Sequence, residues 1–134
     1  MQEKQKHSRR ATVFVVDDND VVRRVLSGIV RQDESLLLVG EATNGAAALE
    51  ALRRKAPDVV CLDMMMPGLD GLGVLEQLRQ KSAETRVIMI TGYPTPDLVN
   101  KSRELGAAGF VVKPFNAAKV LSVIHAALQG RGAS

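Results

Sequence analysis

Five short apolar runs, rich in β-branched residues, alternate along the chain with longer segments whose apolar residues recur every three or four positions. The runs have the length and composition of strands that are buried on both faces. They predict strands over residues 12–16, 36–39, 58–62, 86–91 and 109–112. The longer segments have a helical period. They predict helices over residues 20–32, 45–55, 71–81, 96–105 and 117–128.

Residues suited to helix starts precede several of the predicted helices. Asn44 stands where an N-cap side chain would accept an amide hydrogen bond, and Asn116 directly precedes the last predicted helix. Thr95, Pro96 and Asp97 form a cap, a first-turn proline and an acid that the helix dipole favours. Strands and helices that alternate through short connections indicate one doubly wound α/β domain with a parallel sheet.

Charged and hydroxyl side chains follow the predicted strands at their carboxyl ends. Asp17 and Asp18 follow the first strand, Asp63 the third, Thr91 the fourth and Lys113 the fifth. Because the carboxyl ends of parallel strands share one edge of the sheet, we expect these side chains to lie together. Three carboxylates in one place repel each other at neutral pH, and a hard divalent cation with oxygen ligands would neutralise them. The sequence therefore predicts an anionic, metal-dependent pocket.

Composition limits the environment and partners of the chain. Its 134 residues are enough for one domain with its own core. Cys61 is the only cysteine, so no internal disulfide forms, and we expect a cytoplasmic protein. No apolar run approaches the ~20 residues that span a bilayer, so we expect no membrane insertion.

The basic excess of the chain is confined to its start. Residues 1–10 carry a net charge of +3, whereas the remainder has 14 basic and 14 acidic residues. We interpret residues 1–10 as a basic disordered tail. With aromatic residues at 3% and no Trp, we expect no direct nucleic-acid binding.

The ordered set of strand-end residues resembles the receiver domain of response regulators, the CheY-like superfamily of two-component signalling. The residues that carry the likeness are Asp17-Asp18, Asp63, Thr91 and Lys113-Pro114-Phe115. The likeness covers residues 11–128 and leaves a C-terminal tail over residues 129–134. It implies a flavodoxin-like fold with five parallel strands in the order 2-1-3-4-5 and five helices.

The resemblance also implies a Mg²⁺ site. Asp18 and Asp63 would bind the ion directly, and Asp17 would act mainly through a water molecule. The remaining protein ligand in the family is a backbone carbonyl two residues after the phosphoacceptor, which is Met65 here. Carboxylates, a carbonyl, water and phosphate are oxygen ligands that suit Mg²⁺.

The same resemblance implies a phosphorylation chemistry. Asp63 would accept a phosphoryl group and hold it as an acyl phosphate. Lys113 would pair with this carboxylate and then with the phosphoryl oxygens, and Thr91 would donate its hydroxyl to a phosphoryl oxygen. Phe110 matches the switch aromatic of the family, although it is equally consistent with an ordinary core residue. The Lys113–Pro114 bond is expected to be cis.

The function that follows is signal reception rather than turnover of a separate substrate. A sensor histidine kinase or a histidine phosphotransfer protein would phosphorylate Asp63, docking on the helix that carries Arg23 and Arg24. A downstream protein would bind the face formed by residues 96–128. Alternatives are a phosphorelay shuttle or phosphate sink without an output switch, and the N-terminal receiver of a longer regulator. We expect no enzyme activity beyond autocatalytic phosphorylation and weak self-dephosphorylation.

Rival classes fit less well. A phosphatase of the haloacid dehalogenase type needs a second Asp two residues after the nucleophile, where this chain has Met65. A flavodoxin-like cofactor carrier needs a phosphate loop after the first strand, but residues 17–20 carry three acids that would repel a phosphate. A pseudo-receiver typically lacks an acid or the lysine, and none is missing.

Overall fold

The computed structural model describes residues 9–81 and 84–130. Strands and helices alternate through this part of the chain, as the pattern predicts. The first half contains β1 (Ala11–Val16), α2 (Asp20–Gln32), β2 (Leu36–Ala42), α3 (Gly45–Lys55) and β3 (Val59–Asp63). The second half contains α4 (Gly71–Lys81), β4 (Arg86–Thr91), α5 (Pro96–Glu104), β5 (Gly109–Val112) and α6 (Ala117–Gln129). Most of the two predicted tails, residues 1–8 and 131–134, lies outside the described residues.

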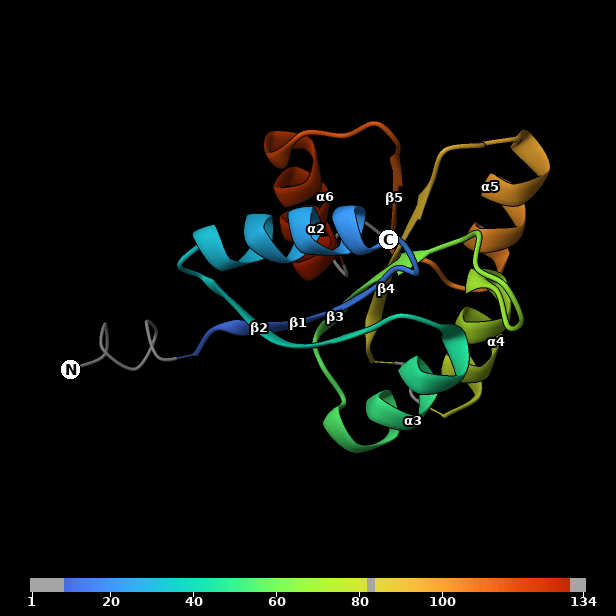
Figure 1. Cartoon of the computed structure of the whole chain (residues 1–134), viewed down its shortest axis with the longest axis horizontal. Coiled ribbons are helices and arrows are strands. Elements are labelled where there is room, and N and C mark those ends of the chain that lie inside the picture. Colours follow the sequence, from blue (N-terminus) through green and yellow to red (C-terminus); the bar gives the residue numbers. More distant parts are fainter. Residues whose placement is uncertain (1–8, 82–83, 131–134) are drawn as a thin grey trace.

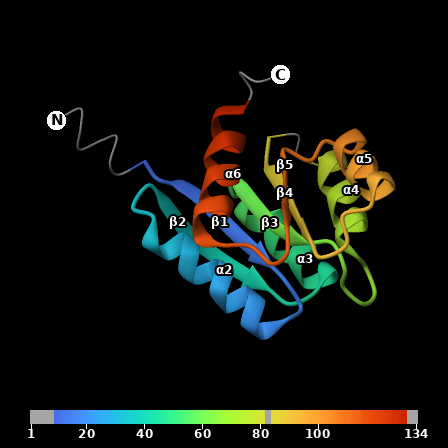
Figure 2. The same ribbon diagram turned by 90° about the horizontal axis from the view of Figure 1, so that it is seen from above.

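The five strands form one parallel sheet in the order β2-β1-β3-β4-β5, which confirms the predicted fold class. Helices α2 and α6 cover one face, and α3, α4 and α5 cover the other (Figure 1). The view from above shows the strands side by side with their helices on both sides (Figure 2). No helix within the described ranges is both long and apolar enough to cross a bilayer.

Each central strand supplies both hydrophobic cores, because successive side chains point to opposite faces of a sheet. In β1, Val13 and Val15 pack beneath α2 and α6, whereas Phe14 and Val16 pack toward α3 and α4. All four side chains are at most 1% exposed. This double burial explains why the strand sequences are continuous apolar runs rather than alternating ones.

Strand β2 is longer than predicted, because pairing with β1 continues past its apolar run. Gly40 lies opposite Phe14 and Ala42 opposite Val16, after a register shift that leaves Val39 of β2 without a partner in β1. A Cβ atom on Gly40 would lie 2.6 Å from the Phe14 ring, so the bulky ring requires a glycine there. The glycine that ends the apolar pattern in the sequence is thus a packing residue within the strand.

Asparagine and threonine side chains cap four of the helices. Asn44, Thr95 and Asn116 each accept a hydrogen bond from the amide three residues later, as predicted for Asn44 and Thr95. Asn19 caps α2 in the same way, with 2.9 Å between its Oδ1 and the Val22 amide. Because Asn19 supplies this cap, the carboxylates of Asp17 and Asp18 are left for another role.

Candidate phosphorylation and metal site

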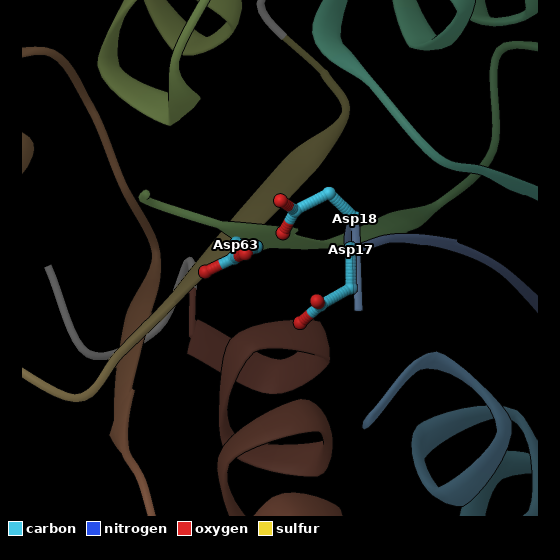
Figure 3. Close-up of side chains that lie close together, drawn as sticks. All are labelled: Asp17, Asp18 and Asp63. Atoms are coloured by element: carbon cyan, nitrogen blue, oxygen red, sulfur yellow. The ribbon is translucent and has the colours of Figure 1, made fainter. Parts of the chain in front are cut away.

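The three predicted acids meet at the carboxyl edge of the sheet. Asp17 and Asp18 directly follow β1, and Asp63 ends the adjacent strand β3. One carboxylate oxygen from each lies within 4.8 Å of the others, and their side chains converge in the close-up (Figure 3). Asp17 is fully buried and Asp63 is 2% exposed, whereas Asp18 is exposed to solvent. The cluster is therefore open on the side of Asp18.

Lys113 brings one positive charge to the buried pair. Its Nζ atom lies 3.3 Å from Asp63 Oδ1 and 3.5 Å from Asp17 Oδ2. The residue directly follows β5, two strands away from β3 in the sheet. The Lys113–Pro114 peptide bond is cis, as the resemblance implied. One ammonium group therefore faces two buried carboxylates.

Burial and charge together perturb Asp63. Loss of hydration, and next the negative charge of Asp17, raise the pKa of Asp63 to about 6. Lys113 and the backbone amide of Met65, which lies 3.3 Å from Asp63 Oδ1, act in the opposite direction. The opposing groups are too weak to hold the pKa at its usual value. The pocket carries more negative charge than the chain itself compensates.

The oxygen atoms fit a divalent cation. Asp17 Oδ1 accepts the Asn19 amide at 2.9 Å, but Asp17 Oδ2 is buried without a hydrogen-bond partner among the described residues. The Lys113 ammonium lies 3.5 Å from this oxygen, and a bound cation or a water molecule would complete its contacts. The donors are all hard oxygens, which suit Mg²⁺. The side chain of Met65 is 55% exposed while its amide contacts Asp63, so its backbone lies beside the cluster.

Thr91 lies at this edge of the sheet, whereas Phe110 lies near the start of β5. Thr91 ends β4, next to the residue paired with Asp63, and its buried hydroxyl oxygen accepts the Tyr93 amide at 3.0 Å. Phe110 is half-buried against the core beneath α3, α4 and α5. It borders a cavity of about 160 Å³ that is also lined by Val99 and Ser102. A core role and a switch role both remain compatible with this position.

Sequence reasoning missed the role of Arg23 and placed it on the surface that docks the phosphodonor. In the structure its side chain is only 12% exposed, and its guanidinium bonds the Asp17 carbonyl and the side chains of Asp20 and Glu41. The spacing of Asp20 and Arg23, three residues apart in a helix, was a visible signal for one of these bonds. The neighbouring Arg24 is exposed, as expected.

Comparison with known proteins identifies the family. Residues 13–125 match the family model of the response regulator receiver domain. The chain is 34% identical to chemotaxis protein CheY of Bacillus subtilis, over 87% of this chain and 96% of that protein. It is also 34% identical to the probable transcriptional regulatory protein NarL of Mycobacterium tuberculosis, over 91% of this chain but only 56% of that protein. This chain belongs to the response regulator receiver domains of two-component signalling.

Solved structures agree with this assignment. The signal receiver domain of NarL from Mycobacterium tuberculosis superposes with a TM-score of 0.86 at 34% identity, over 91% of this chain and 98% of that chain. A chain of the CheX-CheY-BeF3-Mg+2 complex from Borrelia burgdorferi superposes with a TM-score of 0.84 at 28% identity, over 90% and 96% of the two chains. The fold and family expected from the strand-end residues are thereby confirmed.

Proposed function

We propose that this receiver domain accepts a phosphoryl group on Asp63 from a histidine kinase or a histidine phosphotransfer protein, in a reaction that requires Mg²⁺. The observation that carries the proposal is the convergence of Asp17, Asp18, Asp63 and Lys113 at one sheet edge, where a buried Asp17 oxygen accepts no hydrogen bond from the described residues. The proposal places the protein in the cytoplasm, where such kinases present their phosphohistidine.

The transfer step follows from the chemistry of a carboxylate nucleophile. An Asp63 oxygen forms a bond to phosphorus while the phosphorus–nitrogen bond of the phosphohistidine breaks. The imidazole nitrogen leaves with the bonding electron pair and takes a proton from solvent. Bound Mg²⁺ would neutralise charge on the phosphoryl oxygens. Lys113, 3.3 Å from Asp63 Oδ1, is placed to pair with one of those oxygens.

After transfer, the groups of the chain hold the phosphoryl group rather than turn over a separate substrate. Thr91 would exchange its bond with the Tyr93 amide for donation to a phosphoryl oxygen. Weak self-dephosphorylation by water is the extent of catalysis that we propose. The domain is thus a phosphoacceptor and not an enzyme in the usual sense.

An apolar groove beside the site supports docking of the phosphodonor. The groove has a volume of about 410 Å³ and lies between the start of α2 and the loop after β5. Its lining residues are Val21, Val22, Val25, Lys113, Pro114 and Phe115. Val21 is 69% exposed and Val25 48% exposed, although both are apolar. A helix that bears the phosphohistidine would cover these side chains and reach Asp63 past Lys113.

The output of the domain would come from the opposite side of the site. We propose that Thr91 moves toward the phosphoryl group and that Phe110 shifts inward, which changes the surface of α5, β5 and α6. Phe110 already borders a cavity, and Val112 on this surface is 43% exposed. Phosphorylation would bias a two-state equilibrium rather than create a new fold.

The phosphorylation proposal is tested with acetyl phosphate and Mg²⁺, followed by intact-mass measurement. Wild type should gain one phosphoryl group that hydroxylamine removes, and Asp63→Asn should gain none. Asp97→Asn, which changes an exposed acid on α5, is the matched control and should label as wild type does. Labelling that persists in Asp63→Asn, or that EDTA leaves unchanged, contradicts the proposal.

The output proposal needs a separate measurement. Amide chemical shifts with and without beryllofluoride, a phosphoryl mimic, should change over residues 96–115 as well as around the pocket. In Thr91→Ala the pocket shifts should persist and the distant ones should shrink. Shifts confined to the pocket in wild type would instead indicate a phosphorelay shuttle or a phosphate sink.

A further inference from the structure

Arg23 joins three segments that meet beside the acid cluster. Its Nη1 donates to the backbone carbonyl of Asp17 at 3.0 Å, and its Nη2 donates to Asp20 at 2.7 Å. Its Nε donates to Glu41 in β2 at 3.1 Å. All three kinds of guanidinium nitrogen are therefore engaged, in a side chain that is only 12% exposed. A planar fork of donors satisfies three separated acceptors, which the single ammonium of a lysine cannot do.

Both the backbone amide and the backbone carbonyl of Asp17 are hydrogen-bonded, and Arg23 is the donor to the carbonyl. The Asp17 amide donates to the Ala42 carbonyl of β2 at 3.2 Å, and the Asp17 carbonyl accepts from Arg23. The Asn19 amide fixes Asp17 Oδ1 at 2.9 Å. With the backbone and one oxygen fixed, Oδ2 is left within the cluster, buried and without a hydrogen bond among the described residues.

We propose that Arg23 is a positioning residue for the cation site: it fixes the Asp17 backbone so that the carboxylates of Asp17 and Asp18 are held in place before the cation binds. Arg23 touches neither the phosphoryl group nor the cation in this role. It acts through the Asp17 carbonyl, as groups beyond the ligands of a metal commonly orient those ligands. The inference rests on the metal site of the proposed function.

A purely electrostatic role for Arg23 would have the opposite effect on metal affinity. A positive charge near a cation site repels the cation, and its removal would tighten binding. Removal would also release the carboxylate of Asp20, which Arg23 holds in an ion pair. A positioning role predicts weaker binding instead, because the Asp17 backbone loses its anchor. The sign of the change in Mg²⁺ affinity therefore separates the two roles.

The test is the Mg²⁺ dissociation constant from calorimetric titration of the folded chain, with MgCl₂ alone as the ligand. Arg23→Gln should bind Mg²⁺ about tenfold more weakly than wild type, within the range seen when supporting residues of metal ligands are removed. Arg24→Gln, which removes an exposed arginine from the next position, should stay within about twofold of wild type. Acetyl phosphate labelling of Arg23→Gln should recover when the Mg²⁺ concentration is raised.

Each outcome decides the proposal. Unchanged or tighter Mg²⁺ binding in Arg23→Gln overturns it. If Arg23→Gln does not fold, Arg23→Lys keeps the charge and loses the fork, and it must then bind more weakly than Arg24→Lys. If wild type and the Arg23 variant bind Mg²⁺ equally tightly and both are phosphorylated, the positioning role is rejected but the proposed function stands. Wild type that binds no Mg²⁺ rejects the proposed function together with this inference.

Discussion

The carboxyl group of Asp63 is buried next to a second carboxylate, and both features raise its pKa to about 6. When folding raises the pKa of a group, protonation of that group adds to the free energy of unfolding. The full addition is present below the unfolded pKa, which is about 4 for Asp. That contribution is lost as the pH rises through about 6. At neutral pH without a cation, the ionised Asp63 therefore lowers the free energy of unfolding. The proposed phosphoacceptor therefore weakens the metal-free fold.

Asp63→Asn should therefore be more stable than wild type at pH 7 in EDTA, by up to about 3 kcal/mol. The difference should shrink as the pH falls through 6 and close near pH 4, because the wild-type carboxyl group is then neutral as well. Urea denaturation at a series of pH values measures it. A variant less stable than wild type at pH 7 would mean that the bond to Lys113 outweighs burial and repulsion.

Gly71 closes the loop behind Asp63 at a distance that admits no side chain. Its amide donates to the Met64 carbonyl at 3.0 Å, and a Cβ there would lie 2.5 Å from the Asp63 carbonyl oxygen. Gly71→Ala should destabilise the domain by about 1–3 kcal/mol, because rigid backbone atoms must move.

Gly28 in the interior of α2 is the contrasting position, because a Cβ atom there would meet nothing within 4 Å in Gly28→Ala. It should be stabilising by about 0.5–1 kcal/mol, so the two thermal shifts should have opposite signs.

Between elements, a hydrogen bond joins the end of α2 to α6. His125 Nε2 lies 2.8 Å from Asp33 Oδ2 across 92 positions of sequence. The bond from His125, and next that from Ser35, lower the pKa of Asp33 to about 2. Because the pKa is lowered on folding, ionised Asp33 adds to the free energy of unfolding. The full addition is present above the unfolded pKa of about 4 and is lost as the pH falls through about 2. The contact links α2 and α6, the two helices that cover one face of the sheet.

Asp33→Asn should reduce the free energy of unfolding by up to about 2 kcal/mol at pH 5. The deficit should narrow as the pH falls below 4 and become small at pH 2, where about half of wild-type Asp33 is protonated as well. Chemical denaturation at pH 5, 4, 3 and 2 gives the comparison. Glu34→Gln, at an exposed neighbouring position, is the control and should show no such trend. A deficit independent of pH would point to lost packing instead.

Hydrophobic periodicity predicts every described strand and helix, because each element buries a face whose period it must match. It fails at the ends, where long-range pairing decides. Residues 40–42 carry no strand pattern, yet they continue β2 because Phe14 and Val16 in β1 pair with them. Asp58, expected to begin a strand, instead accepts the amide of Thr12 at 2.8 Å.

The acid cluster could be predicted because parallel strands deliver their carboxyl ends to one edge. The residues that support the acid cluster could not be predicted, because their partners are distant in sequence. Arg23 reaches Glu41 only because α2 packs beside β2, and His125 reaches Asp33 only because α6 packs beside α2. Helical periodicity shows that such side chains face away from the core but not which neighbour receives them.

For the whole domain, a cation that binds only the folded chain raises its stability by mass action. Millimolar Mg²⁺ should therefore raise the melting temperature of wild type. Asp18→Ala should lose this rise, because Asp18 is one of the proposed direct ligands, and Lys113→Ala should largely keep it. Scanning calorimetry of the three proteins, each with MgCl₂ and with EDTA, gives the three comparisons. Equal rises in wild type and Asp18→Ala would exclude Asp18 from the metal site.

The site is assembled from the ends of four different strands, with Asp17 and Lys113 contributed by opposite halves of the chain. A chain that lacks β5 would keep the acids but lose the ammonium. If Asp63 is the phosphoacceptor, as proposed, phosphorylation would then require the complete fold. An incompletely synthesised, misfolded or proteolytically cleaved copy would not be phosphorylated and would not pass on a signal.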